Sequence, residues 1–236
     1  MPQKIFLIFL LLLSVTGYGQ VRFDIKEKSM YLPAFHKYGK FDHSLSLVQV
    51  YLPEDWLEQS VSAPMVAYTA NFSLPSGFAL NGSLKTLVIA NDIELGFSWN
   101  RSLTDRLHLG VGYLLGLELG MLRAFNYNNT IRVWGHHPML RLGYNFRNIA
   151  FTLQGRLNWM MGMKLVLEDY ATDNITGSLF NGYSFGILME QRLTRKNSIC
   201  FGFMTNFNKF HILGWPALMI VDHQYFIPEI IIGFRL

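Results

Sequence analysis

Hydrophobic residues alternate with small or polar residues from Arg106 to Met121. Every odd position in this stretch is apolar, whereas only one of the eight even positions, Leu114, is a large hydrophobe. Such a period of two indicates a β-strand, because successive side chains of a strand point to opposite faces. A strand in a soluble sheet runs about 5–6 residues, whereas a tilted strand that crosses a bilayer needs about 9–11. We therefore predict a membrane-crossing strand here.

The same alternation recurs along the chain and predicts further strands. With the first stretch they cover residues 45–52, 66–74, 80–90, 93–99, 107–121, 139–146, 149–165, 183–193, 199–208 and 230–236. The first of them is weak, because its alternation slips near Val48. Ten strands give an even count, as single-chain barrels have. If 84–99 is one strand and 45–52 lies outside the barrel, the count is eight. We predict an all-β, membrane-spanning, antiparallel up-and-down β-barrel over residues 44–236, with ten strands and eight as the alternative.

The segments between these strands are alternately short and long. The short ones are 102–105, 147–148 and 194–196, and the long ones are 123–135, 168–177 and 214–224. Outer-membrane barrels have short periplasmic turns and longer extracellular loops. The three long segments are therefore predicted to be mobile loops on the outer side.

The first residues have the features of a secretory signal peptide. A basic residue, Lys4, precedes a nine-residue apolar run over residues 5–13, and the small residue Gly19 follows. The run is too short to cross a bilayer as a helix, which needs about 20 residues. We expect residues 1–19 to be cleaved off during export. Residues 20–43 are charged and lack a sustained period, which predicts a periplasmic arm or a short plug.

Composition supports a barrel. The chain of 236 residues is 50% hydrophobic and 15% aromatic with only 15% charged residues, which is apolar for a soluble protein. A barrel spreads its lipid-facing residues over alternate positions, so no long apolar run is needed. The net charge of +4 is scattered, which argues against a nucleic-acid partner. Cys200 is the single cysteine, so no disulfide framework or cysteine-based metal site is expected. No cofactor is expected either.

The exported N-terminus, the alternating hairpins and the chain end Ile230-Ile231-Ile232-Gly233-Phe234-Arg235-Leu236 together resemble small outer-membrane β-barrel proteins of Gram-negative bacteria. The resemblance covers roughly residues 45–236 and is architectural. It implies an outer-membrane location with membrane lipid as a partner. It also implies that Ile230, Ile232, Phe234 and Leu236 form the signal that the barrel-assembly machinery recognises. The usual final residue is aromatic, whereas this chain ends in Leu236. No specific activity follows from the resemblance.

Charged and histidine side chains fall on inward positions of the predicted strands. They are Glu94, Arg106, His108, Glu118, Arg141, Arg156, Lys164, Glu190, Arg192, Glu229 and Arg235. An unpaired buried charge costs several kcal/mol, so opposite charges on neighbouring strands should pair. The expected network contains Glu118, Arg141, Arg156 and Glu190. This predicts a largely packed polar lumen and a structural or surface-interaction role, with a narrow channel for small solutes as the alternative.

A lipid-modifying enzyme is the third hypothesis. The candidate residues at the outer rim are His136, His137, His211 and His223, but none has a serine in a recognisable catalytic motif. The His-x-Ser pattern of lipid A deacylase barrels is absent at His211. Adjacent histidines on an extended chain point to opposite faces, which argues against a metal site at His136 and His137. We predict no catalytic and no metal-binding residues.

Aromatic side chains at strand ends are predicted to form the girdles at the two membrane interfaces. The candidates are Trp99, Tyr144, Phe146, Trp159 and Phe234. Trp159 follows the preceding turn by about ten residues, on the order of 25 Å along the membrane normal, which would place it at the outer interface.

Overall fold

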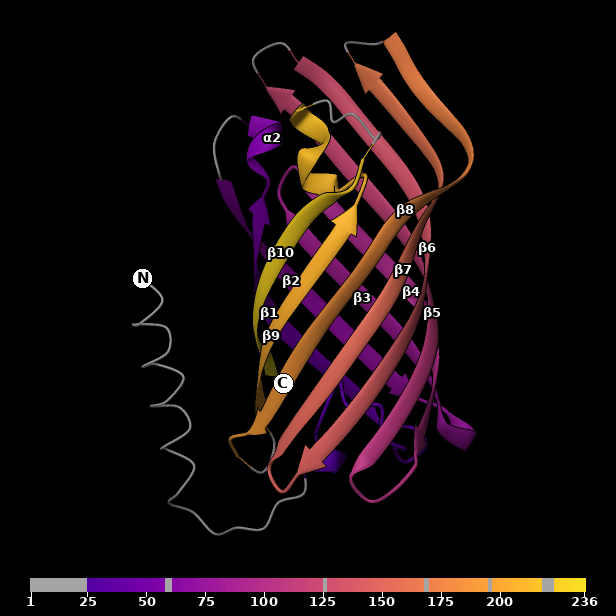
Figure 1. Cartoon of the computed structure of the whole chain (residues 1–236), viewed down its shortest axis with the longest axis vertical. Coiled ribbons are helices and arrows are strands. Elements are labelled where there is room, and N and C mark those ends of the chain that lie inside the picture. The colour runs from indigo at the N-terminus through magenta and orange to yellow at the C-terminus, as the bar shows by residue number, and fades with distance from the viewer. Residues whose placement is uncertain (1–24, 58–60, 125–126, 168–169, 195–196, 218–222) are drawn as a thin grey trace.

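The chain closes into one β-barrel. The structure is a computed structural model that describes residues 25–57, 61–124, 127–167, 170–194, 197–217 and 223–236. Its ten strands are all antiparallel, each pairs with its neighbours in sequence, and the first strand pairs with the last (Figure 1). The predicted up-and-down barrel and the count of ten are confirmed.

The strands differ widely in length. They are β1 (Phe41–Leu52), β2 (Val61–Ser73), β3 (Phe78–Leu87), β4 (Ala90–Ser102), β5 (Leu107–Ala124), β6 (Tyr127–Phe146), β7 (Ile149–Leu167), β8 (Tyr170–Arg192), β9 (Ser198–Asn208) and β10 (Tyr225–Arg235). The short helices are η2 (Ile25–Glu27), α2 (Glu54–Leu57), η3 (Pro75–Gly77) and η4 (Ile212–Ala217). The eight-strand alternative is wrong, because β3 and β4 are separate strands whose hairpin closes at Leu87 and Ala90.

The outside of the barrel is apolar, whereas the inside combines polar, small and apolar residues. On β5, Val111 and Leu115 are exposed, whereas Gly112 and Leu114, which lie between them in the sequence, are buried. A continuous apolar exterior of this kind is unfavourable in water and marks a surface that contacts lipid. Among the described residues, no helix is long and apolar enough to cross a membrane.

The slip in the alternation near Val48 has a structural cause. In β1, Leu45 and Leu47 face outward and Ser46 faces inward, as the period predicts. Farther along, Val48 and Val50 are also inward and are buried in an apolar cluster. The strand is therefore regular, but its inner face changes from polar to apolar at Val48.

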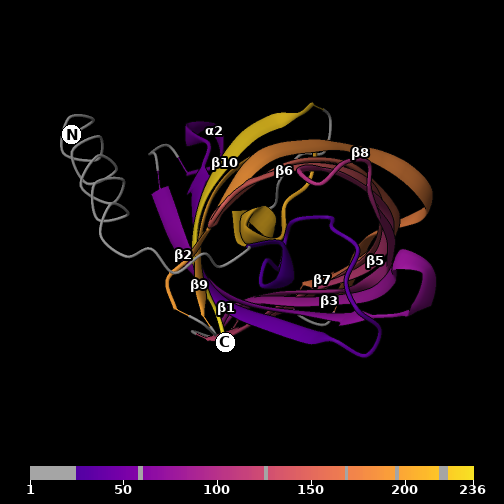
Figure 2. The same cartoon turned by 90° about the horizontal axis from the view of Figure 1, so that it is seen from below.

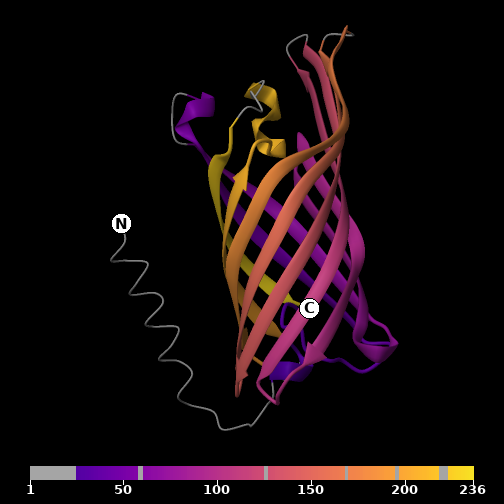
Figure 3. The same ribbon diagram turned by 45° about the vertical axis from the view of Figure 1, so that its right-hand side comes forward.

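The two ends of the barrel differ, and two of the predicted loops are strands. The connections β2–β3, β4–β5, β6–β7 and β8–β9 lie at one end, here called the turn end, and β5–β6 and β7–β8 extend far beyond the other strands at the opposite, hairpin end (Figures 1 and 3). Residues 123–135 and 168–177, predicted as loops, mostly belong to these hairpins. In the first of these segments Ile131 and Val133 face inward into an apolar cluster, whereas Arg132 and Trp134 are exposed, so the apolar alternation there marks the inner face. Of the third predicted loop, 214–224, the first part is η4 and residues 218–222 lie outside the described residues.

A β-bulge in β7 reverses the faces of its outer part. The register shifts between Met160 and Gly162, so that Met161 is an extra residue on the outside. Beyond it, Met163 and Leu165 pack against the inner apolar cluster. An uninterrupted period, which places Lys164 inward, puts its neighbours Met163 and Leu165 outward. This prediction was wrong, because an inserted residue shifts a period of two by one position.

The N-terminal segment fills the turn end of the lumen. Residues 25–34 cross the opening, with η2 inside the outline of the barrel (Figure 2). Ile25, Leu32 and Ala34 are buried together with Ala150 of β7. Gly143 of β6 makes room for this segment, since an added Cβ would lie 2.5 Å from Leu32 Cδ1. We call residues 25–36 the plug.

The hairpin end is filled by η4. Ile212, Leu213 and Trp215 are buried against inward residues of the surrounding strands, including Val50 and Ile227. Trp215 approaches β5 so closely that a Cβ added to Gly120 would lie 2.5 Å from its ring. The plug and η4 thus occupy opposite ends of the same lumen (Figures 2 and 3).

Candidate functional site in the lumen

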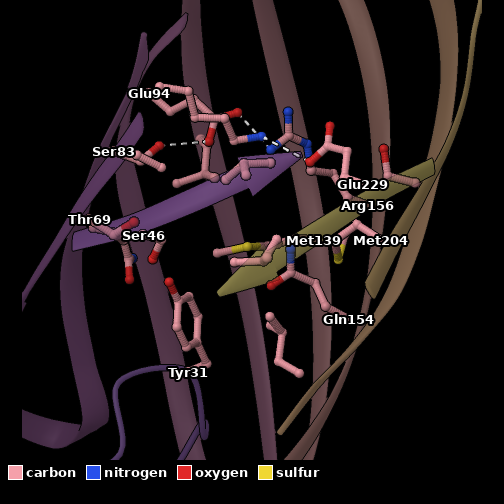
Figure 4. A pocket seen from close by; sticks show the side chains of 18 of the residues that line it. Tyr31, Ser46, Thr69, Ser83, Glu94, Met139, Gln154, Arg156, Met204 and Glu229 are labelled. Atoms are coloured by element: carbon pink, nitrogen blue, oxygen red, sulfur yellow. Dashed lines mark hydrogen bonds and ion pairs between the residues drawn. The ribbon is translucent and has the colours of Figure 1, made fainter. Parts of the chain in front are cut away.

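A polar cavity separates the plug from η4. It encloses about 150 Å³ and receives side chains from both halves of the barrel, with Tyr31 of the plug at one end (Figure 4). At roughly 15 Å³ for each water, this volume holds on the order of ten water molecules. Its charged lining consists of three cations and two carboxylates: Lys85, Arg141, Arg156, Glu94 and Glu229.

Arg156 pairs with Glu94 across the lumen. The Nη1 of Arg156 on β7 lies 2.6 Å from Oε1 of Glu94 on β4, two strands that are not neighbours in the barrel (Figure 4). Ser83 Oγ donates to Glu94 Oε2 at 3.0 Å, and Arg156 Nε donates to Asn158 Oδ1 at 2.8 Å. The ion pair therefore joins two parts of the wall that are separated by β5 and β6, and Ser83 and Asn158 each add a neutral hydrogen bond.

Glu229 of β10 connects the cavity to the η4 side. Lys85 Nζ and His211 Nε2 each lie 3.7 Å from its carboxylate, and Asn206 Nδ2 donates to it at 2.8 Å. His211 immediately precedes η4. The carboxylate thus links β3 and β9 to the segment that fills the hairpin end.

Glu190 of β8 binds the plug. The backbone N–H groups of Met30, Tyr31 and Leu32 donate to its carboxylate at 2.7, 3.0 and 3.3 Å, and Ser29 Oγ donates as well. Successive N–H groups that converge on one anion form a nest. The side chain of Glu190 is 2% exposed. Its charge is therefore balanced by main-chain dipoles of the plug, and no ion pair with Arg156 forms.

Arg141 completes the cavity lining on the plug side. It is buried, and its Nε has no hydrogen-bond partner among the residues that the structure describes. Tyr31 lies on the same side, and burial raises the pKa of its phenol to about 12, so this group stays neutral. Of the five charges in the cavity lining, Arg141 is the one left outside the two ion pairs.

Most of the predicted lumen residues lie on inward positions. These are Glu94, His108, Glu118, Arg141, Arg156, Glu190, Arg192, Glu229 and Arg235. The other two lie elsewhere. Arg106 is exposed in the turn between β4 and β5, and Lys164 faces outward because the bulge at Met161 precedes it.

The sequence analysis missed several partners of these residues. Arg235 pairs with Asp42 at the start of β1, and Nε of Arg235 donates to Asp42 Oδ1 at 3.0 Å. Lys85 was overlooked although the alternation of its strand places it inward. Nothing in the sequence marks the plug N–H groups as partners of Glu190, because every residue except proline carries a backbone N–H. Ser29 likewise lies in no recognisable motif.

One group of side chains near the turn end has the composition of a catalytic triad. His108 Nδ1 lies 2.9 Å from Ser102 Oγ, and its Nε2 lies 2.7 Å from the Asn145 side-chain amide. The surrounding carbonyl groups require the amide nitrogen of Asn145 to face His108 Nε2, which must then accept. Nδ1 therefore donates to Ser102, and this arrangement does not activate the serine as a nucleophile. No group of three or more His, Cys, Asp or Glu side chains among the described residues is suited to hold a metal.

The predicted girdle residues lie on the outside of the barrel. Tyr144, Phe146 and Phe234 are exposed, and Trp99 and Trp159 are half-buried. The ring of Trp159 packs 5.5 Å from His136 and 5.3 Å from Phe180. Ile230, Ile232, Phe234 and Leu236 of the predicted assembly signal are exposed too. Their roles in the membrane and in assembly remain predictions.

The closed barrel, its apolar exterior and its filled lumen define a membrane-spanning β-barrel protein.

No family model matches the chain, and no curated protein matches it. Among solved structures it is similar to Neisserial surface protein A, at 12% identity over 83% of this chain and 96% of that one, with a TM-score of 0.34. It is also similar to the translocator domain of autotransporter NalP from Neisseria meningitidis, at 12% identity over 83% of this chain and 86% of that one, with a TM-score of 0.37. Ail, the attachment invasion locus protein of Yersinia pestis, is similar at 10% identity over 85% of this chain and 100% of that one, with a TM-score of 0.31. Identities this low carry no information about activity.

The Arg156–Glu94 pair predicts energetic coupling across the lumen. Glu94→Ala and Arg156→Ala should each lower the free energy of unfolding, and the double variant should recover part of the loss, with a coupling of about 0.5–3 kcal/mol. The matched cycle of Glu190→Ala with Arg156→Ala should be additive within about 0.5 kcal/mol. Urea unfolding in one detergent measures both. Coupling of Arg156 to Glu190 but not to Glu94 would contradict this arrangement.

The nest around Glu190 predicts that this carboxylate holds the plug in place. Glu190→Ala leaves the plug N–H groups unpaired, and each hydrogen bond to a charged group contributes about 1.5–3 kcal/mol. Trypsin should then cleave the folded variant at Lys26 and Lys28 at least tenfold faster than the wild type. Glu54→Ala, at an exposed position of α2, is the control. Equal cleavage rates in all three proteins would show that Glu190 does not anchor the plug.

Proposed function

We propose that this chain is an outer-membrane β-barrel protein with a closed lumen that acts through its surface. The observation that carries the proposal is the filling of both ends, by the plug on one side and by η4 with its apolar cluster on the other. A lumen filled in this way supports a structural or surface-interaction role better than transport. We also propose that residues 1–19 direct export and are then cleaved off. These residues lie outside the described part of the chain.

The hairpin end provides the surface on which such a role would depend. β5–β8 form a wall that rises beyond η4 and α2 on one side of the barrel (Figure 3). The β5–β6 and β7–β8 hairpins reach farthest at the hairpin end, and outer-membrane barrels have their longer connections outside the cell, so we propose that the hairpin end faces outward and the turn end faces the periplasm. The barrel-assembly machinery and outer-leaflet lipid are the partners we propose on this basis. We propose no enzymatic activity, no cofactor and no nucleic-acid partner.

A narrow channel for small solutes is the second candidate. The observation in its favour is the central cavity of about 150 Å³ with its charged lining. For conduction, both the plug and η4 would have to leave the lumen. The two fillings are held by independent contacts, namely the hydrogen bonds at Glu190 and the apolar cluster around Trp215.

A closed lumen predicts no steady ion conductance in a planar bilayer. The wild-type protein should be silent at moderate voltage, and Glu190→Ala should be silent too, because η4 still fills the hairpin end after the plug has left. An open porin in the same membrane is the positive control, and a mobility shift on heating shows that each sample is folded. Steady, ion-selective conductance of the wild type would favour the channel.

The proposed orientation predicts which end is labelled on intact cells. A cysteine in place of Asn128, at the β5–β6 hairpin, should react with a membrane-impermeant maleimide. A cysteine in place of Leu103, in an exposed turn at the other end, should react only after the outer membrane has been permeabilised. Cys200 is buried and provides the unlabelled background. The opposite labelling pattern would reverse the orientation, and recovery of the wild type as a soluble periplasmic protein would end the membrane assignment.

A further inference from the structure

The outside of the long hairpins contains a recess with two cations. It encloses about 430 Å³ on β4–β7 near the hairpin end and lies apart from the lumen cavity. Its border residues are Asn91, Leu119, Met121, Thr130, Arg132, Lys164 and Val166, together with the inward Gly120 and Ile131. Of the border side chains, Met121, Arg132 and Lys164 are exposed.

The strand register places the border side chains in two rows on the outer face. In one row, Leu119 pairs with Arg132, and Arg132 pairs with Lys164 on the next strand. In the adjacent row, Thr130 lies between Met121 and Val166. Positions directly opposite on antiparallel strands share a face. The recess therefore combines two neighbouring cations with an apolar floor.

Arg132 and Lys164 carry like charges at directly opposite positions of paired strands, and an anion bound between them would offset their repulsion. Like charges directly opposite on paired strands destabilise a sheet. Arg132 and Lys164 form no ion pair with any acidic side chain that the structure describes. The bulge at Met161 is what turns Lys164 outward, since the uninterrupted period would point it into the lumen. Bulges are conserved design features that re-aim side chains, and here the bulge creates the charged pair.

The height of the pair matches the headgroup region. Arg132 lies about 14 residues before Phe146, where β6 reaches the turn end. Lys164 lies about 15 residues after Ile149, where β7 leaves the turn end. At about 3.3 Å per residue and a tilt of about 40°, both lie on the order of 35 Å from the turn end. The apolar band of such barrels is about 25 Å tall. The cations thus lie beyond the band, with the exposed Trp134 one step closer to it on the same face of β6.

We propose that this recess binds the phosphate of a lipid in the outer leaflet whose headgroup has a net negative charge. Arg132 donates through its planar guanidinium to two phosphate oxygens, and Lys164 supplies the second charge. Thr130 and Asn91 offer further polar groups at the rim. The acyl chains descend along Leu119 and Trp134 into the apolar band. A lipid fits better than a free anion, because Leu119, Met121 and Val166 give the recess an apolar border. The inference rests on the proposed outer-membrane location.

The test uses the full-length protein in nanodiscs of phosphatidylcholine that contain a minor fraction of bisphosphoryl or monophosphoryl lipid A. Native mass spectrometry then counts the phosphorylated lipid that stays bound after release into detergent. The wild type should retain bisphosphoryl lipid A in preference to phosphatidylcholine. Arg132→Gln with Lys164→Gln should weaken retention about 30-fold, since each cation near an anionic lipid surface contributes roughly a fivefold change. Arg101→Gln with Lys37→Gln removes the same charge at exposed positions of the turn end and should retain the lipid like the wild type.

Each other outcome overturns the site. Equal retention by the wild type and the Arg132/Lys164 variant would show that the pair does not bind the lipid. Equal retention of phosphatidylcholine would show that the net negative charge of the headgroup is not recognised. Displacement of the lipid by low millimolar inorganic phosphate would assign the cations to a soluble anion. Because nanodiscs impose a bilayer, selective retention is measured independently of cellular location. Failure of the protein to insert or to shift on heating would instead count against the proposed function.

Discussion

The pairing of β1 with β10 is the contact on which the rest of the structure depends. A backbone N–H or C=O without a partner costs several kcal/mol in hydrocarbon, so a sheet with open edges cannot cross a membrane. Residues 44–50 meet residues 229–235 in an unbroken register and remove both edges. The ion pair of Asp42 with Arg235 lies at the end of this seam. Closure then divides every strand into a face for lipid and a face for the lumen.

Closure also creates an interior that strand side chains alone do not fill. Eight strands leave room for side chains only, and ten leave more. Here the plug and η4 take up the extra space, and glycines at positions such as Gly120 and Gly143 allow them to approach the wall. Ion pairs span the polar middle, where Arg156 reaches Glu94 from a strand that is not its neighbour. The lumen is thus organised by contacts across its width rather than along its wall.

The two ends of the barrel have different physical demands. At the turn end, one buried carboxylate, Glu190, organises several N–H groups of the plug. At the hairpin end, the β5–β6 and β7–β8 hairpins continue beyond the other strands. The bulge at Met161 affects both faces of β7 there, because it brings Met163 into the inner cluster and turns Lys164 to the outside.

The sequence by itself determined the number of strands, the faces of most of them and the closed barrel, because the period-two alternation is a local property of the backbone. The outward row of β5 and the exposed Ile230, Ile232 and Phe234 follow from it directly. Only the tertiary structure decided the partners inside the lumen. Arg156 pairs with Glu94 rather than Glu118 or Glu190, since the width of the barrel and the positions of distant strands select the partner. Glu190 binds backbone N–H groups of the plug, which cannot be recognised from the residue types. The bulge that reverses Lys164 was hidden because apolar side chains occupy both faces of β7 there, one face against lipid and the other against the η4 cluster. A period of two shows that a strand has faces, but it does not show where an extra residue exchanges them.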